Sequence, residues 1–205
     1  FHRNSRFSPR TELLGSEFWD SSFSAILETL GNCLLPEKET PAFGPEGTLR
    51  AFKNLHLESS HQPTTDAISH PGGEPPCRTA CFQCVCYGLG NFSSCVASRY
   101  QLAFLLLLLE KLQIPRRQCY IFDPLFSDLE TAVLNDLGVT PLFENEEGKR
   151  HVFKPTIFYM IHCGKALYNN LLWRNWSTET LSKVIIIGNS FKGIEERYLA
   201  PTPTL

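Results

Sequence analysis

Two glycines, Gly88 and Gly90, follow a short apolar run and precede a long apolar stretch. This order is typical of the strand–turn–helix unit that opens dinucleotide-binding folds. Gly88 lets the chain turn sharply, and the missing β-carbon at Gly90 lets a ligand approach the backbone. Ser93 or Ser94 is expected to cap the next helix, whose free N–H groups favour an anion. Ser93 also replaces the third glycine of the full fingerprint, so the loop fits ligand binding and a plain strand-to-helix connection equally well.

Other polar residues with chemical potential follow later apolar runs. Asp123 follows the run 118–122, where an acidic residue in Rossmann-like folds takes ribose hydroxyls, although Asp123 is equally suited to cap a turn. Since the carboxyl ends of parallel strands meet at one edge of a sheet, where open α/β sheets bind ligands, these residues are expected to lie together. The candidate ligand-binding residues are Gly88, Gly90, Asp123, His162, Lys165, Asn189 and Ser190.

Four cysteines form the pattern Cys77-x3-Cys81-x2-Cys84-x-Cys86. Four thiolates close in sequence can bind zinc tetrahedrally, but a zinc ribbon needs two Cys-x2-Cys hooks far enough apart to face each other. Cys84 and Cys86 also belong to a predicted strand with buried side chains. We therefore predict no metal site here, and free cysteines of a reducing compartment.

Five apolar runs alternate with helical patterns and must position these residues. The predicted strands cover 84–86, 118–122, 139–143, 156–160 and 184–188, and the main predicted helices cover 94–113, 127–137 and 166–173. Within the second helix, Ser127-x-x-Glu130 is a capping-box pattern. Alternating strands and helices predict an α/β fold with a Rossmann-like, doubly wound parallel sheet of about five strands in the order 3-2-1-4-5, with flanking helices.

The rest of the chain divides by composition. We expect a disordered tail over 1–15, a packing helix over 16–35, a flexible linker over 36–80, the Rossmann-like domain over 81–197 and an irregular tail over 198–205. The charged segment 144–154 is expected to be a solvated loop.

Composition excludes several functions. The 205 residues are 42% hydrophobic and 20% charged, which is ordinary for a globular domain. A formal net charge of -2 gives no reason to expect nucleic acid or an anionic membrane as a partner. The longest apolar stretch, 102–109, is too short to span a bilayer.

Several segments together resemble one family. They are Tyr87-Gly88-Leu89-Gly90-Asn91-Phe92, Arg99-Tyr100-Gln101-Leu102-Ala103, Phe122-Asp123-Pro124-Leu125-Phe126, the acidic segment 144–150, the segment from Phe158 through His162-Cys163-Gly164-Lys165 to Trp173, and Ile187-Gly188-Asn189-Ser190-Phe191. From about residue 84 to 196 the chain resembles the sensitivity-to-red-light-reduced (SRR-like) family, and closely its animal members.

The resemblance implies a Rossmann-like fold and a regulatory role in circadian clock input and haem biosynthesis, in the cytoplasm with the nucleus as a second compartment. It implies no established catalysis, so the edge residues are expected to bind an unknown metabolite or a protein partner, and the cofactor is unknown. One alternative is an S-adenosylmethionine- or nucleotide-dependent enzyme that uses the Gly88-x-Gly90 loop, with His162 as a base. Another is direct haem binding, with His162 and Cys163 as axial ligands.

Overall fold

A computed structural model describes residues 8–34 and 82–199 of the chain. These residues fall into two compact units, of which one contains residues 8–13 and 82–199 and the other residues 14–34. The predicted linker over 36–80 lies outside the described residues. None of the helices within 8–34 and 82–199 has the length and hydropathy that a bilayer-spanning helix needs.

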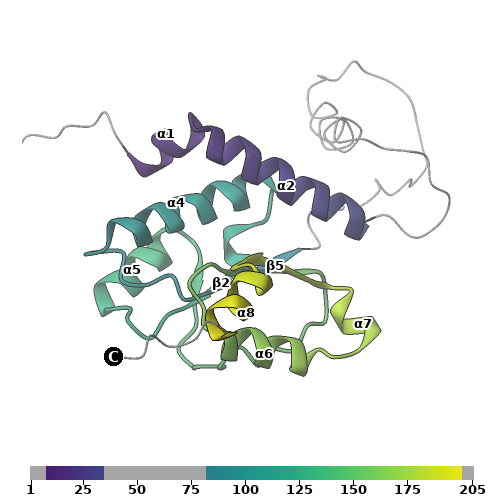
Figure 1. Cartoon of the computed structure of the whole chain (residues 1–205). Helices are drawn as coiled ribbons and strands as arrows, with labels where there is room; N and C mark the ends of the chain where they lie inside the picture. The colour runs from purple at the N-terminus through teal and green to yellow at the C-terminus, as the bar shows by residue number, and fades with distance from the viewer. Residues whose placement is uncertain (1–7, 35–81, 200–205) are drawn as a thin grey trace, which may run out of the picture. The chain divides into compact units, whose positions relative to one another are not determined.

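The larger unit contains a five-stranded parallel sheet (Figure 1). Its strands are β1 (Gln83–Tyr87), β2 (Cys119–Phe122), β3 (Thr140–Pro141), β4 (Thr156–Met160) and β5 (Val184–Gly188). They pair in the order β3-β2-β1-β4-β5, and every pairing is parallel. The fold class and strand order predicted from the sequence are therefore confirmed.

The two central strands, β1 and β4, are apolar on both faces. Every side chain of β4 is buried, and in β1 only the first residue is not. Because successive side chains alternate across a sheet, Cys84 and Cys86 face one side while Val85 and Tyr87 face the other. A strand covered on both sides needs a continuous apolar run, which is why these two segments are recognisable from sequence.

Helix α4 (Val96–Lys111) covers the face of the sheet that carries Cys84 and Cys86. The rings of Phe104 and Tyr159 stack with centroids 6.1 Å apart. Tyr159, which pairs in register with Cys86, also donates its hydroxyl to the carbonyl oxygen of Gln101 at 3.2 Å. The helix is shorter than the predicted 94–113 because Cys95 and Leu112 are its caps.

Helix α5 (Asp128–Asp136) follows β2 and begins with the predicted capping box. Ser127 accepts the backbone N–H of Glu130, while the Glu130 side chain accepts the backbone N–H of Ser127. The next strand is shorter than the predicted 139–143, since only Thr140 and Pro141 pair with β2. Pro141 has no N–H to give to a further strand, so β3 ends the sheet.

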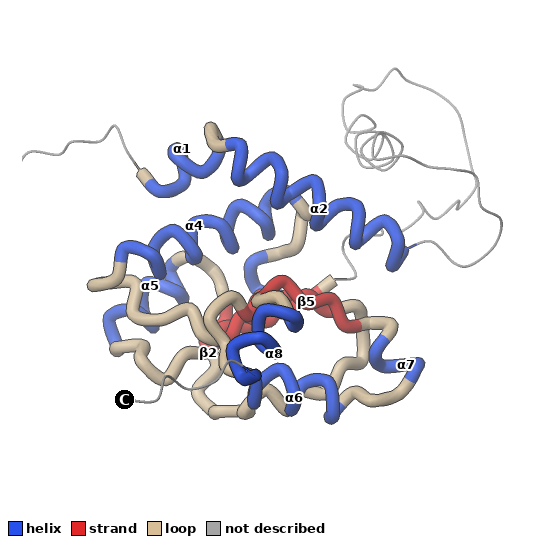
Figure 2. Tube along the Cα trace, in the orientation of Figure 1, coloured by secondary structure: helices blue, strands red, loops and turns tan. Residues whose placement is uncertain are grey.

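Helices α6 (Lys165–Arg174) and α8 (Phe191–Leu199) cover the other face of the sheet. Tyr168, Leu171 and Ile194 pack into a buried cluster with Val85 and Phe158. Figure 2 shows α4 and α6 on opposite sides of the strands. The short helix α7 (Thr178–Leu181) and the 3₁₀ turn η3 (Arg116–Gln118) lead into β5 and β2.

A loop without helix, residues 142–155, connects β3 to β4. Its expected character as a solvated charged surface is wrong for Glu146 and Arg150, which form an ion pair at 2.8 Å with side chains only 29% and 19% exposed. Tyr87 donates its hydroxyl to Glu146, and the Arg150 guanidinium lies 4.6 Å from the centroid of the Tyr120 ring. The loop packs on the sheet because Glu146 and Arg150 pair with each other and contact the side chains of Tyr87 and Tyr120.

Both expected tails contain some helix. Helix α1 (Pro9–Leu14) lies inside the tail 1–15, so the prediction of disorder is wrong for those residues. It is tied to α4 by Arg10, whose Nη2 donates to Glu110 Oε1 at 2.9 Å. Helix α8 includes the first two residues of the tail 198–205, for which an irregular structure is likewise wrong.

The second unit contains helix α2 (Glu17–Leu34), which agrees with the helix predicted over 16–35. The hydroxyl of Ser16 accepts the backbone N–H of Trp19 at 3.2 Å and caps the helix. The rings of Trp19 and Phe23 stack one turn apart with centroids at 5.4 Å. That this helix packs on the α/β domain remains a prediction.

Candidate functional site

The candidate residues follow four of the five strands at the carboxyl edge of the sheet. Gly88 and Gly90 follow β1, Asp123 follows β2, His162 and Lys165 follow β4, and Asn189 and Ser190 follow β5. Hydrogen bonds join some of them directly. Gly90 donates its N–H to Asp123, and the other candidates share the same edge.

Asp123 joins the loop after β1 to the turn after β2. Its carboxylate accepts the N–H of Gly90 at 2.7 Å through Oδ2 and the N–H of Leu125 at 2.9 Å through Oδ1. The side chain is buried, with 8% of its surface exposed. Both carboxylate oxygens of Asp123 therefore accept backbone N–H groups, which agrees with the turn-capping role. A contact between Asp123 and a ribose remains a prediction.

Gly90 has a structural reason to lack a side chain. Its φ is +80°, a conformation that side chains rarely adopt, and a β-carbon there would lie 2.7 Å from Ser98 Oγ. Ser98 is buried in the first turn of α4. The glycine thus lets helix α4 approach the loop, whereas the sequence had suggested the approach of a ligand.

The start of α4 differs from the prediction that Ser93 or Ser94 caps it. Cys95 is the N-cap residue, and its side chain makes no capping hydrogen bond. Both serine hydroxyls donate to Asn91 Oδ1, at 2.7 Å for Ser93 and 2.8 Å for Ser94. The asparagine side chain folds the two serines into a local turn before the helix begins.

Glu130 is an anchor of the same loop that local pattern reading missed. Besides capping α5, its Oε1 accepts the N–H of Ser93 at 2.8 Å. Burial alone raises the pKa of this carboxyl, but the hydrogen bonds from the N–H groups of Ser127 and Ser93 outweigh it, so the pKa is lowered. The capping box was visible in sequence, whereas the second role depends on a contact with a distant loop.

Cys163 lies at the centre of the edge, between β1 and β5. Its thiol donates to the carbonyl oxygen of Tyr87 at 3.2 Å, and its own carbonyl accepts the Asn189 side-chain amide at 3.3 Å. A β-carbon on Gly88 would lie 3.0 Å from its sulfur. Gly88 therefore makes room for this thiol, and Asn189 is engaged in holding the same turn.

The N-terminus of α6 also lies at this edge. Its N-cap is Gly164, which has no side chain to cap the helix, and the N–H of Leu167 donates to the Gly164 carbonyl at 3.1 Å. His162 and Lys165 beside it are exposed, as is Ser190, which accepts the N–H of Gly193 at 3.3 Å before α8. Such a helix start next to a cation has the chemistry to attract an anion.

Three buried thiols, those of Cys84, Cys86 and Cys163, have raised pKa values. A hydrogen bond with Cys119, followed by burial, raises the pKa of Cys84, and burial raises that of Cys86. Burial, followed by the nearby Asp123, raises the pKa of Cys163 to about 12. A thiol with a raised pKa is a weak nucleophile near neutral pH, since the thiolate is the reactive form. Cys77 and Cys81 lie outside the described residues.

A parallel sheet of this order, with a glycine turn after β1 and polar residues along its carboxyl edge, defines a Rossmann-like α/β domain. The model of one family, described as the SRR1 domain, matches residues 71–203. The chain therefore belongs to the SRR1 domain family, and the resemblance to the sensitivity-to-red-light-reduced proteins is confirmed. The match extends past both ends of the segment 84–196 on which that resemblance was based.

Three relatives support this assignment. The "SRR1-like protein" of Mus musculus is 52% identical over 183 residues, which cover 86% of this chain and 68% of the mouse protein. "Protein SENSITIVITY TO RED LIGHT REDUCED 1" of Arabidopsis thaliana is 39% identical over 115 residues, covering 56% of this chain and 42% of the plant protein. The "SRR1-like protein" of Drosophila melanogaster is 38% identical over 108 residues, 53% of this chain and 38% of the fly protein. The matched part is thus less than half of the plant and fly proteins, and no solved structure matches the chain.

Proposed function

We propose that this chain is a non-catalytic regulatory protein that acts in circadian clock input and in the control of haem biosynthesis. Membership of the SRR1 domain family carries the proposal, together with 52% identity to the mouse relative. The name of the plant relative connects that protein to red-light sensitivity. The proposed compartments are the cytoplasm and the nucleus, and the carboxyl edge of the sheet is proposed to bind a metabolite or a protein.

The hydrogen bonding of the edge supports a binding role over a catalytic one. A general base or nucleophile must reach the atom of the substrate on which it acts. Asp123 instead accepts two backbone N–H groups, the Cys163 thiol donates to a backbone carbonyl, and Asn189 holds Cys163. These residues give the edge a fixed shape, and His162 and Lys165 present exposed side chains beside it.

The test is rescue in animal cells from which the endogenous protein has been depleted. Depletion is expected to change the period of a clock reporter and the cellular haem content, and expression of this chain should restore both. A His162→Ala, Lys165→Ala double variant should restore neither, because both side chains lie exposed at the edge. Western blotting should show equal amounts of the two proteins.

The matched control is a Lys111→Ala, Asp136→Ala double variant, which removes two exposed side chains from the ends of α4 and α5. It should restore both readouts fully. If the unaltered chain restores neither period nor haem content, the proposed function is wrong. If the His162→Ala, Lys165→Ala variant rescues as well as the unaltered chain, the carboxyl edge of the sheet is not the surface through which the protein acts.

A further inference from the structure

Three large aromatic side chains are exposed near the amino edge of the sheet, at the opposite end from the candidate site. Phe153 is 79% exposed, Trp173 78% and Trp176 68%. Phe153 precedes β4, and the two tryptophans flank the end of α6. Tryptophan is seldom left this exposed without a reason, because it removes more apolar surface from water on burial than other side chains do.

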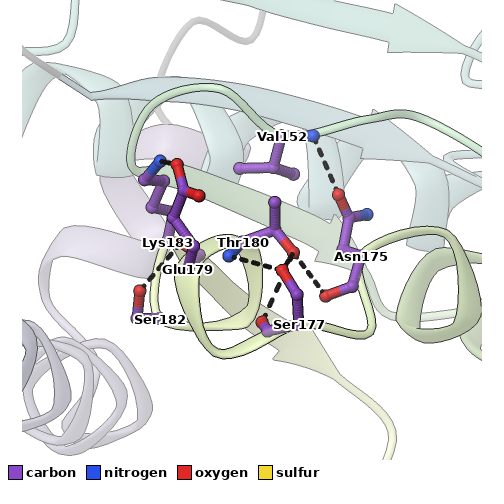
Figure 3. Close-up of polar contacts among 7 residues, drawn as sticks. All are labelled: Val152, Asn175, Ser177, Glu179, Thr180, Ser182 and Lys183. Atoms are coloured by element: carbon purple, nitrogen blue, oxygen red, sulfur yellow. Dashed lines mark hydrogen bonds and ion pairs between the residues drawn. The ribbon is translucent and has the colours of Figure 1, made fainter.

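Asn175 brings the three segments together. It is fully buried, and its Oδ1 accepts the N–H of Val152 at 2.9 Å while its Nδ2 donates to the carbonyl of Arg150 at 2.8 Å. Figure 3 shows the bond between Asn175 and Val152. Phe153 and Trp176 are the direct chain neighbours of this bonded pair, so they lie on adjoining parts of the surface. Trp173 lies in the last turn of α6, three residues before Trp176, which follows the end of that helix.

The segment that carries Trp176 is fixed on its other side as well. Thr180 Oγ1 donates to the carbonyl of Asn175 at 2.6 Å, and Ser177 Oγ accepts the N–H of Thr180 at 3.2 Å (Figure 3). The backbone beneath the aromatic side chains is therefore already ordered. A surface that is ordered before binding loses little conformational entropy when a partner docks.

The charges beside these aromatic residues are positive. Arg174 and Lys154 are exposed, and within residues 82–199 neither forms an ion pair; the Lys154 ammonium instead donates to Gln118 Oε1 at 3.2 Å. The nearby acidic residue Glu179 is paired with Lys183 at 3.3 Å. The uncompensated charge of this surface is thus cationic.

We infer that the amino-edge patch, made of Phe153, Lys154, Trp173, Arg174 and Trp176, docks an acidic protein segment that carries apolar anchor side chains. Tryptophan and arginine dominate the binding energy of protein interfaces, where apolar anchors fill the centre and charges surround them. Two cations suit a short acidic segment, whereas an anionic membrane is usually held by a larger basic cluster. The inference rests on the proposed regulatory function, because it names the class of its protein partner.

The test begins with a display library of random linear peptides selected on the full chain and, in parallel, on a Trp173→Ala, Trp176→Ala double variant. Peptides enriched only on the unaltered chain should contain more Asp and Glu than Lys and Arg, with Leu, Phe or Trp between the acidic residues. The highest-ranked peptide is then measured by fluorescence anisotropy. Its affinity should fall at least about tenfold in the double variant and in an Arg174→Glu variant.

Two controls distinguish specific docking from unfolding of the variant and from non-specific hydrophobic binding. Phe143→Ala removes another aromatic side chain that is 85% exposed, at the carboxyl edge, and should leave peptide affinity unchanged. The thermal unfolding of the tryptophan variant should match that of the unaltered chain. Equal selection on both chains, or enrichment of basic peptides, would overturn the inference.

Two other occupants are distinguished by the same variants. Binding to phosphatidylserine vesicles that is lost in the tryptophan variant, without peptide selection, would assign the patch to a membrane and contradict the inference. Self-association that the variant abolishes would assign it to a second copy of the chain. Since the peptide assay uses purified protein, it can fail while the rescue of clock and haem readouts succeeds, so the two proposals fail separately.

Discussion

Gly90 matches a ligand-binding motif in sequence, but in the structure it makes room for the packing of helix α4. Sequence reading located the turn correctly, since a glycine pair after an apolar run predicts one. It could not reveal that Ser98 of the following helix would occupy the space above the glycine. The position of such a residue follows from local pattern, whereas its reason depends on which neighbour the fold supplies.

Substitution of Gly90 can separate the effect of its positive φ from the effect of its close contact with Ser98. Gly90→Ala should lower the free energy of unfolding by about 1–3 kcal/mol, because the variant must hold alanine at φ +80° and move the Ser98 hydroxyl. Adding Ser98→Ala should recover the steric part of the loss and leave the backbone part. Urea unfolding of the two single variants and the double variant measures both parts.

Gly193 provides the opposite case. It lies within α8, and a β-carbon there would be 3.7 Å from the Ser190 side chain, an ordinary contact. Since Gly193 lies in the first turn of α8, Gly193→Ala should raise stability by at most about 0.5–1 kcal/mol, the gain expected for alanine in a helix interior. Equal destabilisation by Gly90→Ala and Gly193→Ala would contradict the role assigned to Ser98.

Elements with a strong local signal were predicted well. The apolar run 156–160 is strand β4 with the same bounds, and Ser127-x-x-Glu130 forms its capping box. Elements that depend on their surroundings were predicted less well. Strand β3 pairs over only two of its five expected residues, and the loop over 142–155 packs on Tyr87 and Tyr120, which lie far from it in sequence. Helix α8 was also missed, because its short amphipathic pattern follows directly on β5.

At the junction between α5 and the loop after β1, stability should depend on pH. Hydrogen bonds to the Glu130 carboxylate lower its pKa in the folded protein. The contribution of this group is therefore complete above the ordinary glutamate range, about 4.3, and is lost as pH falls through the lower folded value. Glu130→Gln should cost about 1–3 kcal/mol at pH 7 and progressively less at acid pH, as measured by urea midpoints.

Glu195→Gln is the matched control, since Glu195 is exposed on α8. Its midpoints should follow those of the unaltered chain at each pH. A constant difference between the Glu130→Gln variant and the unaltered chain from pH 7 to acid pH would show that the charge of Glu130 does not support the junction.

At the scale of the whole sheet domain, the five thiols within residues 82–199 divide into one exposed thiol and four buried ones. Cys84, Cys86, Cys119 and Cys163 are buried, and Cys95 is exposed. A hydrogen bond from the Ser98 hydroxyl lowers the pKa of Cys95. In native buffer, iodoacetamide should modify Cys95 well before these four, which react only when the domain opens. Peptide mass spectrometry measures the order.

The same experiment tests the cause of the Cys95 reactivity. Ser98→Ala should slow the alkylation of Cys95 near neutral pH and leave it unchanged at a pH where every exposed thiol is ionised. In urea, Cys95 and the four buried thiols named above should react at similar rates. Modification of Cys84 as fast as Cys95 in native buffer would mean that the sheet is not the stable core described here.

The buried amide of Asn175 has a consequence for N-linked sugar. Asn175-Trp176-Ser177 has the pattern that oligosaccharide transfer requires, but both N–H groups of this side chain donate, at 2.8 Å and 2.9 Å, to backbone carbonyls. A sugar would replace one of these hydrogens at a position with no exposed surface. Glycosylation at Asn175 is therefore incompatible with the hydrogen bonds that join the end of α6 to the loop before β4. A chain that is glycosylated there before it folds would be unable to form these bonds.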